Sequence, residues 1–306
     1  MMKAAIYEKT QSGKVLQIGD VEKPQPKENE VLLKVHAASV NPLDWRLKNC
    51  RPGVDVAGEV EAVGSSVTRF KPGDAVFGLG KGAFSEYACA AESALCSKPI
   101  GISFEEAAAI PIAGLTALQG LRDKGRLQPG QKVLINGAAG GIGTFAVQIA
   151  KAMGAEVTGV CSTGNIELVR SLGADRVIDY TREDFTQTAV RYDVVLDNVG
   201  NLSLSRLRRV LTPSGRCALA GAPKTLPAAL GRIAKAFLWS PFLRQKLIFF
   251  IAKRRPDDLQ TVCELIEAGK LKPAIEKCYP LSEAADAIAY VETGHARAKI
   301  VITTGS

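Results

Sequence analysis

KVLINGAAGGIG, residues 132–143, carries an apolar strand directly into a glycine-rich turn. The run Val133–Ile135 can be buried on both faces of a parallel sheet, and a helix with one apolar side is expected over Thr144–Met153. Strand, turn and helix in this order hold the pyrophosphate of a dinucleotide at the helix N-terminus. The residues expected to contact that group are Ala138, Ala139, Gly140, Gly141, Ile142 and Gly143.

The turn departs from the usual dinucleotide fingerprint at one position. Ala138 stands where the first glycine is normally found, so the motif is Ala-x-Gly-x-x-Gly. Gly140 is expected to let the backbone approach phosphate, and Gly143 to let the helix pack closely on the strand. The alternative is an ordinary glycine turn that binds nothing, but the flanking strand and helix favour the dinucleotide.

The size and charge of the chain limit the domain organisation and the partners that it can have. A length of 306 residues predicts two domains, each able to bury a core of its own. The net charge of +8 favours acidic ligands, including a phosphate-bearing cofactor. Because the basic residues are scattered and no helix-turn-helix or RNA-binding signature is seen, no nucleic acid partner is expected.

The seven cysteines show no Cys-x-x-Cys pair and no regular spacing. This pattern argues against a disulfide framework or a structural zinc lobe, and it favours reduced thiols and a cytoplasmic location. Lys3–Glu8 have the pattern of a short strand, so no secretory signal is expected.

Residues 228–255 hold many large apolar side chains, including Trp239, but Arg232, Lys235, Arg244 and Lys246 interrupt them. These charges argue against a membrane span. One interpretation is a basic amphipathic surface that touches a membrane or a partner. The favoured one is a helix and a core strand at a domain or dimer interface, because apolar residues of large α/β proteins are mostly core.

Two kinds of pattern divide the chain. Residues 1–113 have short strands between Gly and Pro turns, which predicts a β-rich domain. From Gly114 strands and helices alternate, which predicts a doubly wound parallel sheet with right-handed crossovers. We place this domain over residues 114–269 and expect residues 270–306 to complete the first. The strands expected in the β-rich part are 31–35, 58–63, 75–77, 84–88, 277–281 and 299–303, and those of the parallel sheet are 132–136, 156–160, 176–178, 193–196, 216–219 and 246–252.

Two helices outside the glycine turn have recognisable ends. A helix is expected over Leu115–Asp123, before the turn Pro129-Gly130. A second is expected over Ser282–Glu292, with Ser282 as the N-cap and Gly294 as the stop.

Six motifs, taken together, resemble the medium-chain dehydrogenase/reductase superfamily, and within it the zinc-free quinone oxidoreductase and enone reductase branch. They are Ala38–Asp44, Gly53–Val60, Lys71–Gly78, Ala109–Ala117, the glycine turn and Gly294–Val301, which span nearly the whole chain. The resemblance implies a GroES-like catalytic β domain built from both chain ends, a Rossmann domain between them and an active site in the cleft. It also implies a homodimer or a larger assembly.

The same resemblance bears on metal. Zinc-dependent relatives have a Cys and a His as ligands where this chain has Asn41 and Asp55. No substitute ligand set is visible, because His36 and His295 are far apart in the sequence and the cysteines do not cluster. The chemistry is therefore expected to need no metal, and a zinc alcohol dehydrogenase is disfavoured.

The expected cofactor is NADP(H). The strand 156–160 is followed by Cys161-Ser162-Thr163-Gly164-Asn165, without the acid that NAD-preferring domains use for the ribose. Ser162 and Thr163 can donate to a 2′-phosphate, although both residue types are also common in turns. In the related branch, Ser162 and Tyr180 match positions that contact this phosphate. Relatives usually carry Arg or Lys at the Gly164 position, and Arg170 or Arg182 are possible substitutes.

Four residues are catalytic candidates through the resemblance. Asn41 has a carbonyl and an amide that can orient the nicotinamide or bond a substrate carbonyl, unless it only makes an Asn-Pro turn. Arg46 matches a Lys near the cofactor, and Asp44 can hold it by a charge-assisted pair; a surface ion pair is the alternative. Thr116, at the start of the interdomain helix, matches a residue that touches the nicotinamide.

The remaining candidates follow strands of the parallel sheet. Asn198, Val199 and Gly200 follow the fourth strand, and Ala220 and Gly221 follow the fifth, at the edge where ligands bind in this architecture. Lys299 matches a lysine that faces the cofactor cleft in the branch, and a solvated strand-edge lysine is the alternative.

The expected reaction is hydride transfer to a quinone or to the β-carbon of an enone. Relatives carry a longer excursion where this chain has only residues 47–54. This short loop and the basic apolar segment allow one rival function, an NADP(H)-binding protein of low activity with a membrane-peripheral or scaffolding role.

Overall fold

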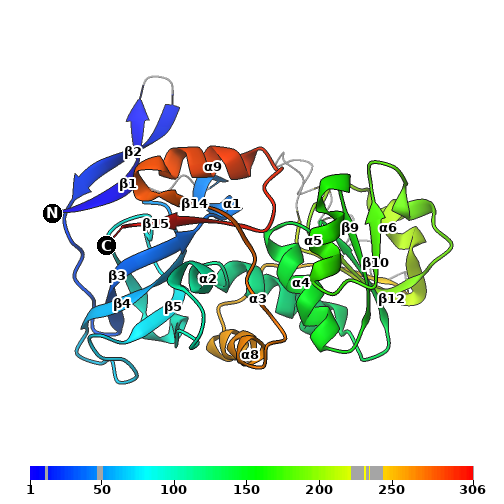
Figure 1. Cartoon of the computed structure of the whole chain (residues 1–306), viewed down its shortest axis with the longest axis horizontal. Coiled ribbons are helices and arrows are strands. Elements are labelled where there is room, and N and C mark those ends of the chain that lie inside the picture. Colours follow the sequence, from blue (N-terminus) through cyan, green and yellow to red (C-terminus); the bar gives the residue numbers. More distant parts are fainter. Residues whose placement is uncertain (11–12, 47–50, 222–230, 232–233, 235–243, 306) are drawn as a thin grey trace. The chain divides into compact units, whose positions relative to one another are not determined.

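The computed structural model describes residues 1–10, 13–46, 51–221, 231, 234 and 244–305. Contacts divide the chain into two compact units (Figure 1). The first unit holds Met1–Ala113, Arg254–Glu267 and Pro273–Ser306, and the second holds Gly114–Lys253 and Ala268–Lys272.

One helix changes the domain boundary expected from the sequence. The sequence placed residues 254–267 in the second domain, whereas they cluster with the first unit. The reason is α8 (Pro256–Glu267), which buries Leu259, Val262 and Ile266 and contacts β7 (Leu95–Ser97). The thiol of Cys96 on β7 lies 3.8 Å from the Pro256 carbonyl oxygen.

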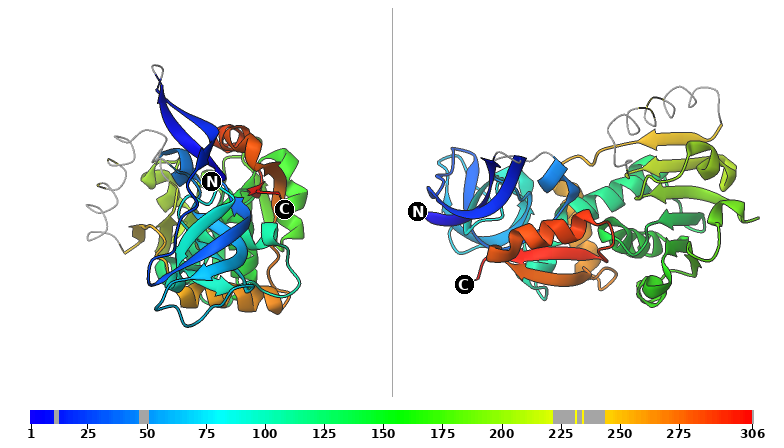
Figure 2. Two further views of the ribbon diagram at one scale, coloured as in Figure 1. Left: turned by 90° about the vertical axis from the view of Figure 1, so that its left-hand side faces the viewer. Right: turned by 90° about the horizontal axis from the view of Figure 1, so that it is seen from above.

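The first unit is built on a seven-stranded sheet with the order β14-β15-β3-β4-β5-β7, in which β6 also pairs with β3. Its other strands are β3 (Glu30–Ser39), β4 (Asp55–Val63), β5 (Ala75–Leu79), β6 (Tyr87–Ala91), β14 (Ile275–Pro280) and β15 (Lys299–Thr303). Because β15 runs antiparallel to β3, both ends of the chain build one sheet, as expected. A hairpin of β1 (Met2–Thr10) and β2 (Gly13–Val21) projects from this unit (Figure 2).

Besides α8, several helices and helical turns accompany this sheet. They are η1 (Glu92–Ala94), α1 (Pro42–Arg46), α2 (Phe104–Ala108) and α9 (Ala284–Glu292), which η6 (Leu281–Glu283) precedes. The Ser103 side chain and Glu106 form a capping box at the start of α2.

Two local predictions in the first unit were wrong. Ser282 is not the N-cap of α9, because it lies inside η6; the N-cap position is Glu283, which makes no side-chain cap bond within the described residues. The strand expected over 84–88 begins only at Tyr87; before it, Ser85 makes an isolated antiparallel bridge with Ala4, and the Phe84 carbonyl accepts from the Ala5 amide. Gly294 ends α9 as expected, with a φ of +82° that favours glycine.

The second unit is a parallel sheet with the order β10-β9-β8-β11-β12-β13, the six-strand order predicted for a Rossmann domain. Its strands are β8 (Lys132–Asn136), β9 (Glu156–Cys161), β10 (Arg176–Asp179), β11 (Tyr192–Asp197), β12 (Leu211–Leu219) and β13 (Lys246–Phe249). The central strands β8 and β11 are buried on both faces, as their apolar runs predicted. Strand β13 lies at one edge (Figure 2).

The described helices of this unit are α3 (Pro111–Gln119), α4 (Gly141–Ala152), α5 (Ile166–Ser171) and α6 (Leu204–Arg209), with short turns η3 (Thr163–Asn165) and η4 (Phe185–Gln187). The boundary between the units falls within α3. The helix expected over Leu115–Asp123 therefore starts four residues earlier in α3, and it continues as a π-helical turn, η2 (Gly120–Gly125). Arg126, with a φ of 53°, ends it.

Half of the basic apolar segment, residues 228–255, lies outside the described residues. Trp239, Arg232 and Lys235 fall there, so the choice between a surface and an interface stays open. Within the parts of the chain that the structure describes, no helix is long and apolar enough to span a bilayer.

Candidate active site

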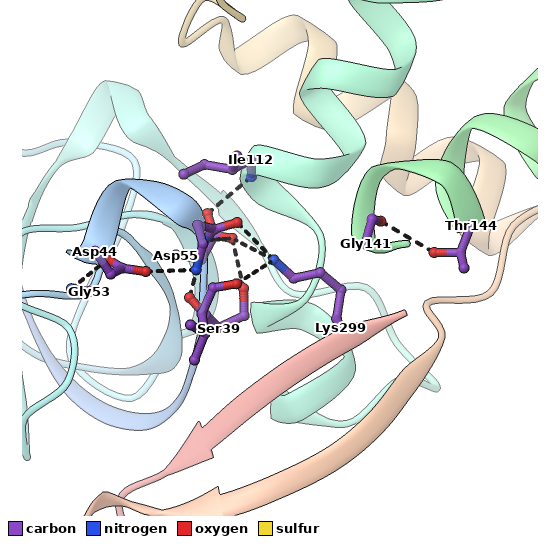
Figure 3. Close-up of polar contacts among 10 residues, drawn as sticks. Ser39, Asp44, Gly53, Asp55, Ile112, Gly141, Thr144 and Lys299 are labelled. Atoms are coloured by element: carbon purple, nitrogen blue, oxygen red, sulfur yellow. Dashed lines mark hydrogen bonds and ion pairs between the residues drawn. The ribbon is translucent and has the colours of Figure 1, made fainter. Parts of the chain in front are cut away.

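Four polar residues from separate elements meet inside the first unit. Ser39 ends β3, Asp55 begins β4, Lys299 begins β15, and Asn41 follows β3 directly. The pairing of Ser39 with Asp55 across β3 and β4, and of Ser39 with Val301 across β3 and β15, brings them together. All four are buried. Figure 3 shows the Lys299 amine directed toward Asp55.

Asn41 uses its side-chain amide inside the protein. Its Nδ2 donates to Asp55 Oδ2 at 2.8 Å and to the Ser39 carbonyl oxygen at 3.1 Å. Its Oδ1 accepts from Lys299 Nζ at 2.8 Å. Both amide hydrogens are therefore used in hydrogen bonds within the protein. The second lone pair of Oδ1 is the position at which Asn41 can still accept a hydrogen bond from a ligand. The expected bond from Asn41 to a substrate carbonyl oxygen has no donor in this arrangement.

Lys299 is a buried cation, which overturns the alternative of a solvated strand-edge lysine. It is 3 % exposed, and its Nζ lies 3.3 Å from the Val40 carbonyl oxygen and 3.6 Å from Asp55 Oδ2. Burial lowers the pKa of Lys299, while the charges of Asp55 and Asp44 oppose this. Burial likewise raises the pKa of Asp55, which Lys299, Asn41 and Ser39 oppose.

Asp55 is the group that fixes this cluster. Its Oδ2 accepts from Ser39 Oγ at 2.8 Å, and its Oδ1 accepts from the Ile112 backbone amide at 3.0 Å. It was named from the sequence only as the residue in place of a zinc ligand. A stronger signal was present, because a charged residue at the start of a strand flanked by Val54 and Val56 needs a buried partner.

Asp44 and Arg46 do not form the predicted pair. The Asp44 carboxylate accepts from the backbone amides of Asn41 at 2.7 Å and Gly53 at 2.9 Å. Arg46 is exposed, and within the described residues no ion pair joins it to Asp44. Asp44 instead ties α1 to Gly53, near the end of the short loop. Residues 47–50 of that loop lie outside the described residues.

The titration of Asp44 gives a first prediction. Burial raises the pKa of Asp44 to about 7, against opposing hydrogen bonds from Asn41 and Gly53. Between about pH 4 and pH 7 the unfolded chain therefore releases a proton that the folded chain keeps, so stability falls as pH rises. The full loss is of the order of 4 kcal/mol. Asp44→Asn should remove this part of the pH dependence.

The measurement is the melting temperature of both proteins across that pH range. The melting temperature of the variant, relative to that of the wild type, should rise steadily from about pH 4 to pH 7. A constant difference caused by its altered hydrogen bonds would add to this trend. Parallel curves would show that Asp44 is ionised throughout.

The cluster does not fit a zinc ion. Asn41 Oδ1 and Asp55 Oδ2 already face an ammonium group, which supplies a positive charge at the position where the resemblance places the metal. Among the residues that the structure describes, no three His, Cys, Asp or Glu side chains gather in a way that could hold a metal.

The glycine turn of the second unit fits a dinucleotide. Gly137, with a φ of +77°, makes the tight turn one position before Ala138, so the alanine needs no left-handed conformation. A Cβ on Gly143 would lie 2.1 Å from the Gly137 carbonyl oxygen, which explains the glycine there. A Cβ on Gly140 would meet only that oxygen, at 3.5 Å, among the described atoms considered, leaving its outer side open.

The N-terminus of α4 is available for an anion. Gly140 is the N-cap of this 12-residue helix, and no side chain of the described part caps it. The backbone amides of Gly141, Ile142 and Gly143 are in the first turn, where N–H groups lack partners within a helix. Ala138 and Ala139 are buried beneath the turn. An uncapped helix N-terminus of this kind suits the phosphate groups of a dinucleotide.

The carboxyl ends of β11 and β12 lie beside this turn. Asn198, after β11, has shielded Nδ2 and Oδ1 atoms that make no hydrogen bond within the described residues. An unpaired buried amide is costly, so it marks a place for a polar ligand. A Cβ on Gly221, after β12, would lie 2.5 Å from the Asn198 carbonyl oxygen, so this glycine allows the two loops to touch. Val199 is exposed; Gly200 and Ala220 have positions in the same loops.

The end of β9 holds Ser162 and Thr163, as predicted, together with an acid that the sequence reasoning missed. Thr163 Oγ1 lies 2.5 Å from Asp179 Oδ2, at the end of the neighbouring strand β10. Ser162 Oγ accepts from Asn165 Nδ2 at 3.0 Å. Tyr180 is 57 % exposed. Thr116 is buried within α3, in its second turn rather than at its start.

Comparisons with known proteins agree with this architecture. A family model described as an alcohol dehydrogenase GroES-like domain matches residues 27–100, and one described as a zinc-binding dehydrogenase matches residues 172–302. A chloroplast envelope quinone oxidoreductase homolog from Arabidopsis thaliana is 36 % identical, over 91 % of each chain. An NADPH-dependent alkenal/one oxidoreductase from the same plant is 34 % identical, over 98 % of this chain and 79 % of its own. The quinone oxidoreductase of Coxiella burnetii has a similar structure, with a TM-score of 0.86 at 30 % identity over 99 % of each chain.

Proposed function

Because the chain belongs to the medium-chain dehydrogenase/reductase superfamily of oxidoreductases, we propose that it is an NADPH-dependent, zinc-independent reductase of quinones or α,β-unsaturated carbonyl compounds. The observation that carries the proposal is the glycine turn, whose open side at Gly140 and uncapped helix N-terminus suit a dinucleotide. The printed names of the relatives supply the class of acceptor.

The second unit would hold the dinucleotide. The first-turn amides of α4 would bind the pyrophosphate, with Gly140 allowing its close approach. The unpaired Asn198 amide would bind a polar group of the cofactor at the carboxyl edge of the sheet. The Ser162 hydroxyl accepts from Asn165 and keeps its own hydrogen, which it can donate to a 2′-phosphate. Tyr180 and Ala220 would lie near these groups.

The first unit would supply polar groups to the reaction, as the resemblance implies. When bound, NADPH supplies the hydride. Lys299 and Asp55 hold the Asn41 amide in one orientation, so that the remaining Oδ1 lone pair can accept a hydrogen bond from a ligand. The buried ammonium of Lys299 keeps a positive charge there without a metal. The final proton would come from water.

The test is oxidation of NADPH by the purified chain. We expect a simple quinone, an alkenal, or both to accelerate the loss of NADPH absorbance, with the same rate after treatment with a metal chelator. If NADPH binds but neither acceptor increases the rate, the reductase proposal is wrong. A rate that chelation abolishes and zinc restores would contradict zinc independence.

We also propose that the chain is a homodimer in a reducing compartment such as the cytoplasm. The resemblance suggests the dimer, and the six cysteines of the described residues, all free thiols, agree with such a compartment. Light scattering on the same preparation would give the oligomeric state.

A further inference from the structure

Asp179 brings a carboxylate to the place where the dinucleotide fingerprint expects one. In NAD-binding Rossmann domains an acid about 20 residues after the glycine loop bonds the ribose hydroxyls. Thr163 occupies that place in this chain, directly after Ser162 and the end of β9. Asp179 ends β10 and pairs in register with Cys161 of β9, so its carboxylate reaches Thr163 from the neighbouring strand.

The hydrogen bonds of Asp179 decide what this place can offer a ligand. Thr163 Oγ1 donates to Asp179 Oδ2 at 2.5 Å, and Thr181 Oγ1 donates to Oδ1 at 2.7 Å. The Thr181 backbone amide also donates to Oδ1, at 2.9 Å. These hydrogen bonds, the one from Thr163 first, lower the pKa of Asp179, so it is ionised at neutral pH.

Both hydroxyls donate to the carboxylate, and their oxygen atoms also lie 3.1 Å from each other, a contact in which either could donate. What Thr163 and Thr181 present on their outer sides are oxygen lone pairs, so the cluster of Asp179, Thr163 and Thr181 is an acceptor surface with a negative charge. A ribose with two free hydroxyls can donate to such a surface. A 2′-phosphate cannot, because it carries acceptors only and a charge of the same sign.

Ser162, one residue away, has the opposite character. Its Oγ accepts from Asn165, so its hydrogen is available to a phosphate. The exposed Tyr180 hydroxyl follows Asp179 directly. The end of the sheet thus combines donors that suit NADPH with an acceptor cluster that suits NADH.

We propose that Asp179, acting partly through Thr163, sets the cofactor preference of this chain. It opposes binding of the 2′-phosphate and favours the free ribose, so that the chain binds NADH in addition to NADPH. The inference rests on the proposed function, because it needs the dinucleotide to bind at the glycine turn. The charge of Arg182 also favours the ionised form of Asp179. It limits the repulsion between the Asp179 carboxylate and a 2′-phosphate without removing it.

The experiment measures the dissociation constants of NADPH and NADH by fluorescence titration, without any acceptor. Asp179→Asn should tighten NADPH and weaken NADH, changing their ratio by about tenfold or more at low salt. Thr163→Val, which removes the outward lone pairs and keeps the charge, should weaken NADH by about threefold to tenfold and leave NADPH nearly unchanged. This second variant replaces an exposed side chain by one of similar shape, so it should fold even if the first does not.

Asp184→Asn is the matched control. Asp184 lies on the same unit, also accepts from a threonine hydroxyl, that of Thr186 at 2.7 Å, and pairs with Arg206. Its variant removes the same charge elsewhere and should leave the ratio of dissociation constants within about twofold of the wild type.

The outcomes separate the two proposals. If the wild type binds neither dinucleotide, the proposed function fails. If both dinucleotides bind and neither Asp179→Asn nor Thr163→Val changes their ratio, or if Asp184→Asn changes it equally, the assignment of cofactor preference to Asp179 is wrong.

Discussion

Gly140→Ala is expected to fold normally and to bind NADPH roughly a hundredfold more weakly than the wild type, a loss of about 3 kcal/mol. The added Cβ would meet only the Gly137 carbonyl oxygen, at 3.5 Å, among the described atoms considered, so the turn has room for it. It would occupy the side from which the pyrophosphate approaches the amides of α4. Fluorescence titration and a melting curve measure the two effects.

Gly143→Ala is the contrasting variant, because its Cβ would strike the turn itself. That atom would lie 2.1 Å from the Gly137 carbonyl oxygen and 2.6 Å from the Ala138 carbonyl carbon. We expect both lower thermal stability and lost binding. A Gly140→Ala protein that binds NADPH as tightly as the wild type would place the pyrophosphate elsewhere.

Lys299→Met should destabilise the first unit by about 3–5 kcal/mol, because it leaves the Asp55 carboxylate buried without its cation. Asp55 is fully buried and Lys299 is 3 % exposed. Adding Asp55→Asn should recover most of the loss, since no unpaired charge then remains. Denaturant unfolding of the single and double variants gives the free energies.

Lys3→Met is the matched control for this prediction. Lys3 pairs with Asp20 at 2.8 Å in the same unit, but both side chains are more than half exposed. An exposed pair contributes less than about 1 kcal/mol. The cluster would not depend on charge pairing if Lys299→Met lowered the free energy of unfolding by no more than Lys3→Met. The same would follow if adding Asp55→Asn to Lys299→Met lowered it further.

The sequence predicted best those features that depend on residues close together along the chain. The glycine turn and the strands of the parallel sheet follow from local apolar runs and glycine spacing, and the strand order was predicted correctly. One local prediction that failed was Ser282, whose type fits an N-cap but whose position inside η6 depends on packing.

Side-chain partnerships were predicted less well, because strand register decides them. Asp179 reaches Thr163 only because β10 pairs with β9, and sequence spacing gives no sign of this. Asn41 stays a predicted site residue, and its hydrogen bonds with Asp55, Ser39 and Lys299 depend on three strands meeting. Asp44 and Arg46 are only two positions apart, which suggested an ion pair. The pair does not form, because Asp44 is buried and Arg46 is exposed.

The pairing of β15 with β3 has a consequence for synthesis on the ribosome. Ser39 is made long before its partner Val301. The first unit must therefore wait with an open sheet edge while the parallel sheet of the second unit, whose strands all lie between residues 132 and 249, can already fold. Nascent chains halted before Lys299 would expose β3 to aggregation and would be the natural clients of chaperones.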